Sequence, residues 1–174
     1  MQSCRVLWIT GLSGAGKSTV ANEVVLRLRH SGRPVVMLDG DELREVFGVF
    51  EAMDNNHARD TRLALAMKYS KLCHLLAKQN ISVVIATISL FKEVHDWNRK
   101  NLPGYYEVYL KIPLQELRRR DPKGLYKGYD DGLIKNVAGL DLEIDEPKTP
   151  DLLIDHTSQR SIMEIVDILV DKIK

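Results

Sequence analysis

Hydrophobic residues in this chain gather in five short runs, at residues 5–10, 34–39, 81–87, 105–112 and 151–154. Short apolar runs of this kind are typical of buried strands. Between them, apolar residues recur every three or four positions, which indicates amphipathic helices. This alternation predicts an α/β fold, with a mostly parallel five-stranded sheet, helices on both faces and right-handed crossovers. In such folds, ligands bind beyond the carboxyl ends of the strands.

Helices are expected over about 57–78, 91–101 and 158–173, with a first helix that ends near Gly32 and a short one after Pro113. Gly32 suits a helix C-cap, and Ser161 with Glu164 has the spacing of a capping box. Two helices are expected to bury one face each; the inward residues are Leu65, Tyr69, Leu72 and Leu76 in the long helix and Ile162, Ile165, Leu169 and Ile173 in the last.

Residues 121–150 break this alternation. They are rich in Gly, Pro, Lys and Asp and show no clear period. A segment of this length inside a compact domain is usually functional. We therefore expect a mobile lid over bound nucleotides.

Residues 11–19 read Gly-Leu-Ser-Gly-Ala-Gly-Lys-Ser-Thr and fit the pattern of a phosphate-binding loop. The glycines allow tight turns that direct backbone N–H groups at phosphate oxygens. Lys17 supplies a charge for the β- and γ-phosphates, the Ser18 hydroxyl suits Mg²⁺, and the next helix adds its positive dipole end. The loop follows an apolar run and precedes a helical pattern, which is the order the motif needs. The expected ATP-binding residues are Gly11, Ser13, Gly14, Ala15, Gly16, Lys17, Ser18 and Thr19, with Arg120 from the lid.

The second apolar run ends in Leu38-Asp-Gly-Asp41. Asp39 suits the metal, as the acidic partner of Ser18. Asp41 can accept the proton of an attacking hydroxyl, and Arg44 can hold an anionic group of the acceptor. The structural alternative is a polar turn in which Asp41 caps a helix.

The third apolar run leads to Ile88 and Ser89 at the same rim of the sheet. The Ser89 hydroxyl or N–H can meet a phosphate or sulfate oxygen. The alternative is a helix N-cap for the segment that begins near Phe91. A covalent role is disfavoured, because no His is placed in the sequence to activate this serine.

Cations cluster where the lid begins. Residues 120–127 read Arg-Asp-Pro-Lys-Gly-Leu-Tyr-Lys, and Lys135 with Asn136 forms a second polar pair. Such cations can stabilise the charge that spreads over a transferring phosphoryl group. The alternative is a solvated surface, which is the interpretation given to Arg118 and Arg119.

The chain has 174 residues, a formal net charge of +1, 44% hydrophobic and 28% charged residues. This composition is expected of a single soluble domain over 1–174, and the charge gives no reason to expect nucleic acid or an anionic membrane as a partner. Cys4 and Cys73 have the spacing of neither a zinc site nor a disulfide framework. No apolar run reaches membrane-spanning length, so a cytoplasmic enzyme is expected.

These motifs together resemble the adenylyl-sulfate kinases of sulfate activation, over about residues 5–155. The segment at 120–127 is the most specific part of the resemblance. The resemblance implies Mg²⁺ as cofactor, ATP as co-substrate and a homodimer. It also implies transfer of the γ-phosphate to the ribose 3′-hydroxyl of a small nucleotide. Asp41 and Lys17 would be catalytic, and Ser18 and Asp39 would serve the metal. The implied acceptor-binding residues are Asp41, Arg44, Arg59, Ile88, Ser89, Lys123, Leu125, Lys127, Lys135 and Asn136.

The chain departs from the family pattern on the acceptor side alone. Val137 stands where the family usually has a Phe that stacks on adenine, and Phe47 or Phe50 is expected on the other side of the base. Residues 64–68 lack the usual polar Asn and Arg, for which Arg59 or Arg62 would substitute; Leu90 stands where Pro is common. The acceptor is therefore either adenylyl sulfate, the main reading, or its analogue cytidine diphosphoramidate.

Three rival functions are weaker. A guanine-nucleotide switch needs an Asn-Lys-x-Asp segment, which is absent from the sequence. A catalytically dead nucleotide sensor need not keep Lys17, Ser18, Asp39 and Asp41. A shikimate or gluconate kinase is disfavoured by the lid sequence at 120–127.

Overall fold

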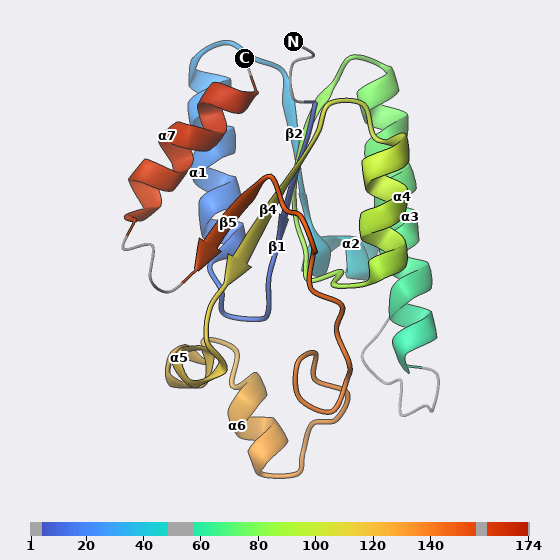
Figure 1. Ribbon diagram of the computed structural model, residues 1–174, viewed down its shortest axis with the longest axis vertical. Helices are drawn as coiled ribbons and strands as arrows, with labels where there is room; N and C mark the ends of the chain where they lie inside the picture. Colours follow the sequence, from blue (N-terminus) through green and yellow to red (C-terminus); the bar gives the residue numbers. More distant parts are fainter. Residues whose placement is uncertain (1–4, 49–57, 156–159, 174) are drawn as a thin grey trace.

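The computed structural model describes residues 5–48, 58–155 and 160–173. Its centre is a five-stranded sheet in the order β2-β3-β1-β4-β5 (Figure 1). Every strand pairing described is parallel, so the predicted sheet is confirmed. The strands are β1 (Val6–Thr10), β2 (Val35–Asp39), β3 (Ser82–Ala86), β4 (Tyr105–Lys111) and β5 (Leu152–Asp155).

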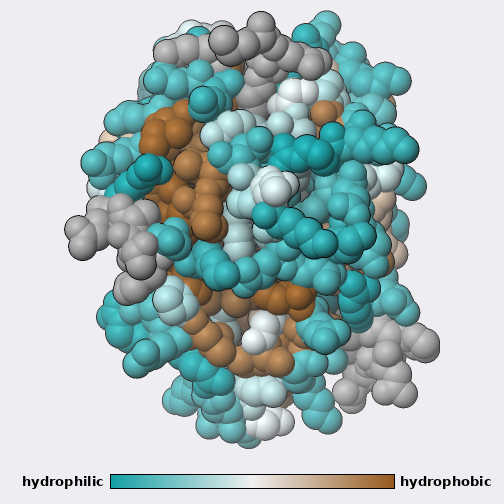
Figure 2. All heavy atoms as spheres, in the orientation of Figure 1, coloured by the Kyte–Doolittle hydropathy of each residue, from teal (hydrophilic) through white to brown (hydrophobic). Residues whose placement is uncertain are grey.

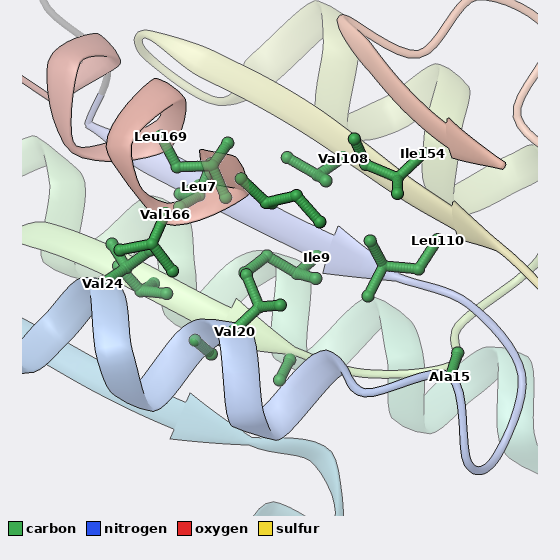
Figure 3. Close-up of a cluster of buried hydrophobic side chains, with 14 of the residues drawn as sticks. Leu7, Ile9, Ala15, Val20, Val24, Val108, Leu110, Ile154, Val166 and Leu169 are labelled. Carbon is green, nitrogen blue, oxygen red and sulfur yellow. The ribbon is translucent and has the colours of Figure 1, made fainter. Parts of the chain in front are cut away.

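Helices cover both faces of the sheet because the central strand is apolar on both sides. In β1, Leu7 and Ile9 face a core shared with α1 and α7, while Val6 and Trp8 face a second core shared with α3 and α4. Figure 3 shows the first core, where side chains of β1, β4 and β5 meet those of the two helices. The helices are α1 (Lys17–His30), α2 (Gly40–Val46), α3 (Ala58–Lys78), α4 (Lys92–Asn101), α5 (Leu114–Arg120), α6 (Leu125–Asp130) and α7 (Ile162–Lys172).

Most predicted helices occur with shifts of a few residues at their ends. The capping box is confirmed, since the Ser161 hydroxyl accepts from the Glu164 N–H while the Glu164 carboxylate accepts from the Ser161 N–H. Ile162 is 47% exposed, so its predicted inward position is wrong. This residue lies in the first turn of α7, beyond the stripe of Ile165 and Leu169 that meets the core.

Residues 121–150 contain more regular structure than their composition predicts. Asp121 accepts hydrogen bonds from the backbone N–H groups of Tyr126 (3.2 Å) and Lys127 (2.9 Å), and these bonds fix the first turn of α6. Both α5 and α6 lie beyond the arrowheads of β4 and β5 (Figure 1). The segment thus lies at the edge of the sheet where the fold predicts ligands.

Candidate active site

A cavity of about 1050 Å³ lies beyond the carboxyl ends of the strands. The strand register brings the ends of β1, β2 and β3 together there, because Asp39 is paired with Ala86 and Ala86 with Ile9. Figure 2 shows apolar side chains in two groups, one at the upper left and one in the lower half, with polar side chains around them. The cavity wall is mixed in the same way, with the phosphate loop and α2 on one part and apolar residues such as Leu142 and Ile144 on another.

The phosphate loop joins β1 to α1 in the expected way. Gly11 has φ +151°, and a Cβ there would lie 2.6 Å from the Leu110 carbonyl oxygen, so a side chain does not fit. Lys17 folds back and donates from Nζ to the Leu12 carbonyl (2.8 Å). From α6, the buried Tyr126 donates its hydroxyl to the Ser13 carbonyl (2.9 Å). The loop is thus anchored both from within and by α6.

The charge state of Lys17 depends on its surroundings. Burial lowers the pKa of Lys17 to about 8; the nearby Asp41 charge opposes this and the Lys123 charge adds to it. Because phosphate charges favour the ammonium form, a bound triphosphate would raise this pKa again. Lys17 is therefore a cation that nucleotide binding stabilises.

Asp39 and Ser18 meet in the cavity, with the Ser18 hydroxyl 2.6 Å from Asp39 Oδ2. A hydroxyl and a carboxylate are hard oxygen donors that suit Mg²⁺ completed by water and phosphate oxygens. The pair therefore fits the metal that the motif implies. Asp39 also caps α2, because its Oδ1 accepts from the Asp41 N–H (2.8 Å). The alternative in which Asp41 caps this helix is wrong.

Asp41 projects from the first turn of α2 into a group of cations. Lys123, between α5 and α6, donates to its Oδ2, and Arg44 lies 3.3 Å from its Oδ1. Burial alone would raise the pKa of Asp41, but the hydrogen bond and charge of Lys123, with the charges of Arg44 and Lys17, lower it overall. The carboxylate is therefore ionised at neutral pH, as a proton acceptor must be.

Ser89 lies at the end of the turn after β3 in a strained conformation, with φ +33°. Its hydroxyl is 2.8 Å from that of Thr87, and the Ile88 carbonyl accepts from the Thr10 hydroxyl. The N-cap of α4 is Phe91, so the helix-cap alternative for Ser89 is wrong. A buried, strained serine in a cavity wall is consistent with a ligand contact.

Most of the predicted site residues meet at this one cavity. Those that line it are Ser13, Gly14, Gly16, Lys17, Ser18, Thr19, Asp39, Asp41, Arg44, Ile88, Ser89, Arg120, Lys123, Leu125, Lys135 and Asn136.

Four predicted site residues are not among those that line the cavity: Gly11, Ala15, Arg59 and Lys127. Gly11 and Ala15 belong to the phosphate loop and contribute to its turn, in which the Ala15 N–H donates to the Leu12 carbonyl. Arg59 pairs with Asp145 (3.0 Å) and Glu93 (3.5 Å), and its guanidinium lies 5.3 Å from the Phe91 ring centroid. Its contacts therefore join α3 to the start of α4.

Several lining residues lay outside the predicted set, notably Thr61, Tyr69 and Glu143. Of the two arginines named as alternatives, Arg62 lines the cavity and Arg59 does not. Helical spacing indicated that Tyr69 is buried, but no motif marked it. Phe47 packs against Tyr69, with ring centroids 6.0 Å apart, and is not among the lining residues; Phe50 lies outside the described residues.

Residues 5–48, 58–155 and 160–173 contain no group of three or more His, Cys, Asp or Glu side chains that could hold a metal ion. The helices within these ranges are too short or too polar to cross a bilayer.

A glycine-rich phosphate loop between β1 and α1, with carboxylates after β2 at the same edge of the sheet, defines a P-loop kinase. A sequence model described as adenylylsulphate kinase matches residues 2–155, and the chain belongs to that family.

Three known proteins show the range of this family. The chain is 37% identical over 168 residues to the cytidine diphosphoramidate kinase of Campylobacter jejuni, covering 97% of this chain and 95% of that one. It is 34% identical to the adenylyl-sulfate kinase of Clostridium kluyveri, covering 97% and 85%. The structure of the Mycobacterium tuberculosis APS kinase CysC, in complex with AMPPNP and APS, superposes with a TM-score of 0.84 at 33% identity, over 98% of both chains.

Proposed function

We propose that this protein transfers the γ-phosphate of ATP to the ribose 3′-hydroxyl of a nucleotide that ends in a compact, sulfate-like group. One observation carries the proposal: Lys17, the Ser18–Asp39 pair and Asp41 line a single cavity at the carboxyl ends of the parallel strands. Together they supply a cation for the phosphates, oxygen ligands for a metal ion, and a general base.

The chemistry divides between the two sides of the cavity. The loop N–H groups, Lys17 and Arg120 would hold the triphosphate, and Ser18 with Asp39 would hold Mg²⁺, which neutralises phosphate charge when bound. Asp41 would take the proton of the 3′-hydroxyl as its oxygen forms a bond to the γ-phosphorus. The bond between that phosphorus and the β,γ-bridging oxygen breaks, and ADP leaves.

The lid would serve both sides at once. Tyr126 connects α6 to the phosphate loop, and Lys123 reaches Asp41 across the cavity. An anionic acceptor would compete with Asp41 for the Lys123 ammonium, because both are anions that pair with it. We infer that acceptor binding frees the base.

Adenylyl sulfate is the first candidate acceptor, in keeping with the family. Cytidine diphosphoramidate is the second, and a specific observation favours it. Val137 is 3% exposed and lies in the cavity wall, where it offers a base only an aliphatic surface. A base that loses an aromatic stacking partner loses roughly 1–3 kcal/mol. An adenine site that depends on that ring would therefore be weakened by this amount.

The test is ATP consumption by the purified chain with each nucleotide in turn, with the phosphorylated position of the product mapped by NMR. A 3′-phosphorylated product from either nucleotide supports the proposal, and the ratio of kcat/KM between the two identifies the preferred acceptor. Turnover that is equal with and without an acceptor would refute it.

A further inference from the structure

The position of Asp41 depends on a helix of only seven residues, α2. This helix also carries Arg44, so both side chains move with its backbone. Asp39 fixes its first turn from the side of β2. The opposite side of α2 faces the long helix α3, where Tyr69 is 3% exposed.

Tyr69 contacts both ends of α2. Its hydroxyl donates to the carbonyl of Gly40 (3.1 Å), the residue between Asp39 and Asp41. Its ring packs against Phe47, the C-cap of α2, at 6.0 Å between centroids. A two-turn helix held at both ends by one rigid side chain has little freedom to tilt.

Gly40 is confined from the other side as well. A Cβ at this position would lie 3.0 Å from Thr87 Oγ1 and 3.3 Å from the Ala86 carbonyl oxygen. The backbone turn from Asp39 to Asp41 therefore lies between the end of β3 and the Tyr69 hydroxyl, in contact with both. Removing that hydroxyl releases the turn on one side only, away from β3.

The Tyr69 hydroxyl remains a hydrogen-bond donor at neutral pH. Burial and the neighbouring carboxylates raise the pKa of Tyr69 to about 12, despite the opposing charge of Arg44. The phenol therefore stays protonated and continues to donate to Gly40 throughout the neutral range.

We propose that Tyr69 is a positioning residue for the acceptor side: it holds α2 against α3 so that Asp41 and Arg44 stay aligned with the phosphate loop. The inference rests on the proposed function for the role of Asp41. Tyr69 itself need not touch a reacting atom.

Tyr69→Phe removes only the hydroxyl and keeps the ring. A misplacement of about 1 Å can lower catalysis by up to about 100-fold, so a partial release should lower kcat/KM for the acceptor by about tenfold. KM for ATP should stay within about twofold, because the ATP loop is anchored separately through Tyr126.

Ser70→Ala is the matched control. Ser70 is the next residue of α3, it is buried, and its hydroxyl donates within the helix to the Ala66 carbonyl (3.3 Å). It is not among the residues that line the cavity. This variant loses a buried hydroxyl of the same helix and should keep wild-type kinetics.

Hydrogen–deuterium exchange supplies a readout that needs no acceptor. In Tyr69→Phe, amide exchange over residues 40–46 should quicken while exchange in α1 stays unchanged. If the wild type phosphorylates neither nucleotide, the proposed function fails, and this exchange experiment still tests the positioning role. Wild-type exchange over 40–46 in Tyr69→Phe, or an equal kinetic loss in Ser70→Ala, would overturn the inference.

Discussion

The proposed ATP side of the cavity and its proposed acceptor side are built in different ways. The ATP side comes mainly from one continuous stretch, Ser13 to Thr19, whose loop is closed by local contacts such as Lys17 to Leu12. The acceptor side comes from α2, the start of α3, the turn after β3 and residues 133–144. These segments meet only because parallel strands end at the same edge of the sheet.

This difference separates the reaction from its specificity. The continuous side handles a group common to every ATP-dependent phosphoryl transfer. Apart from Asp41 on α2, the proposed base, the residues of the discontinuous side could change one by one without disturbing that chemistry. The position of Val137 and the contacts of Arg59 lie on this variable side. The predictions below test the division.

Lys17→Ala should have the largest effect, because it removes the cation that both acceptors depend on. Transfer to adenylyl sulfate and to cytidine diphosphoramidate should both fall below detection in a coupled ADP-release assay. Wild-type rates with either acceptor would show that the loop does not hold the transferred phosphate.

Asp41→Asn should lower kcat by about 10²–10⁴ while ATP affinity hardly changes, because the variant loses a general base and keeps the phosphate site. Stopped assays of product and fluorescence titration with an ATP analogue would measure the two quantities. An unchanged kcat would remove Asp41 from the reaction.

Val137→Phe should shift the kcat/KM ratio towards the adenine nucleotide by about 10–100-fold, since a stacking ring adds roughly 1–3 kcal/mol. Val137→Leu is the control for size, and thermal unfolding checks that the buried site accepts the larger ring. A selectivity ratio equal to that of the wild type would contradict the stacking argument.

Arg62→Ala should raise KM for the acceptor by about tenfold, as expected for the loss of one charge-assisted hydrogen bond. Arg59→Ala should change it by less than about threefold, because Arg59 is not among the residues that line the cavity. Steady-state kinetics of both variants would decide between these arginines. The opposite ranking would restore Arg59 as the acceptor residue.

ATP affinity should depend on pH through Lys17. Its pKa of about 8 in the free enzyme means that the ammonium is present below pH 8 and is lost as the pH rises. Binding above that pH must then take up a proton, so affinity should fall by about tenfold between pH 7 and pH 9. Calorimetry in buffers of different ionisation enthalpy would detect the uptake, and Lys17→Arg, which stays charged, should show a flat profile.

The amino-acid sequence by itself determined the five strands and their parallel pairing, the phosphate loop and the two carboxylates after β2. These features depend on local rules, namely apolar periodicity and a motif whose residues are neighbours in the chain. Even the capping box at Ser161 follows from four consecutive positions.

The tertiary structure alone decided which side chains face one another across the cavity. Arg59 and Arg62 are three positions apart on one helix, but only Arg62 lines the cavity, because the rotation of α3 is set by its packing on the sheet. The contact of Tyr69 with Gly40 likewise joins residues 29 positions apart in the chain. Such contacts depend on how helices pack on a shared core, and no local pattern in the chain encodes that arrangement.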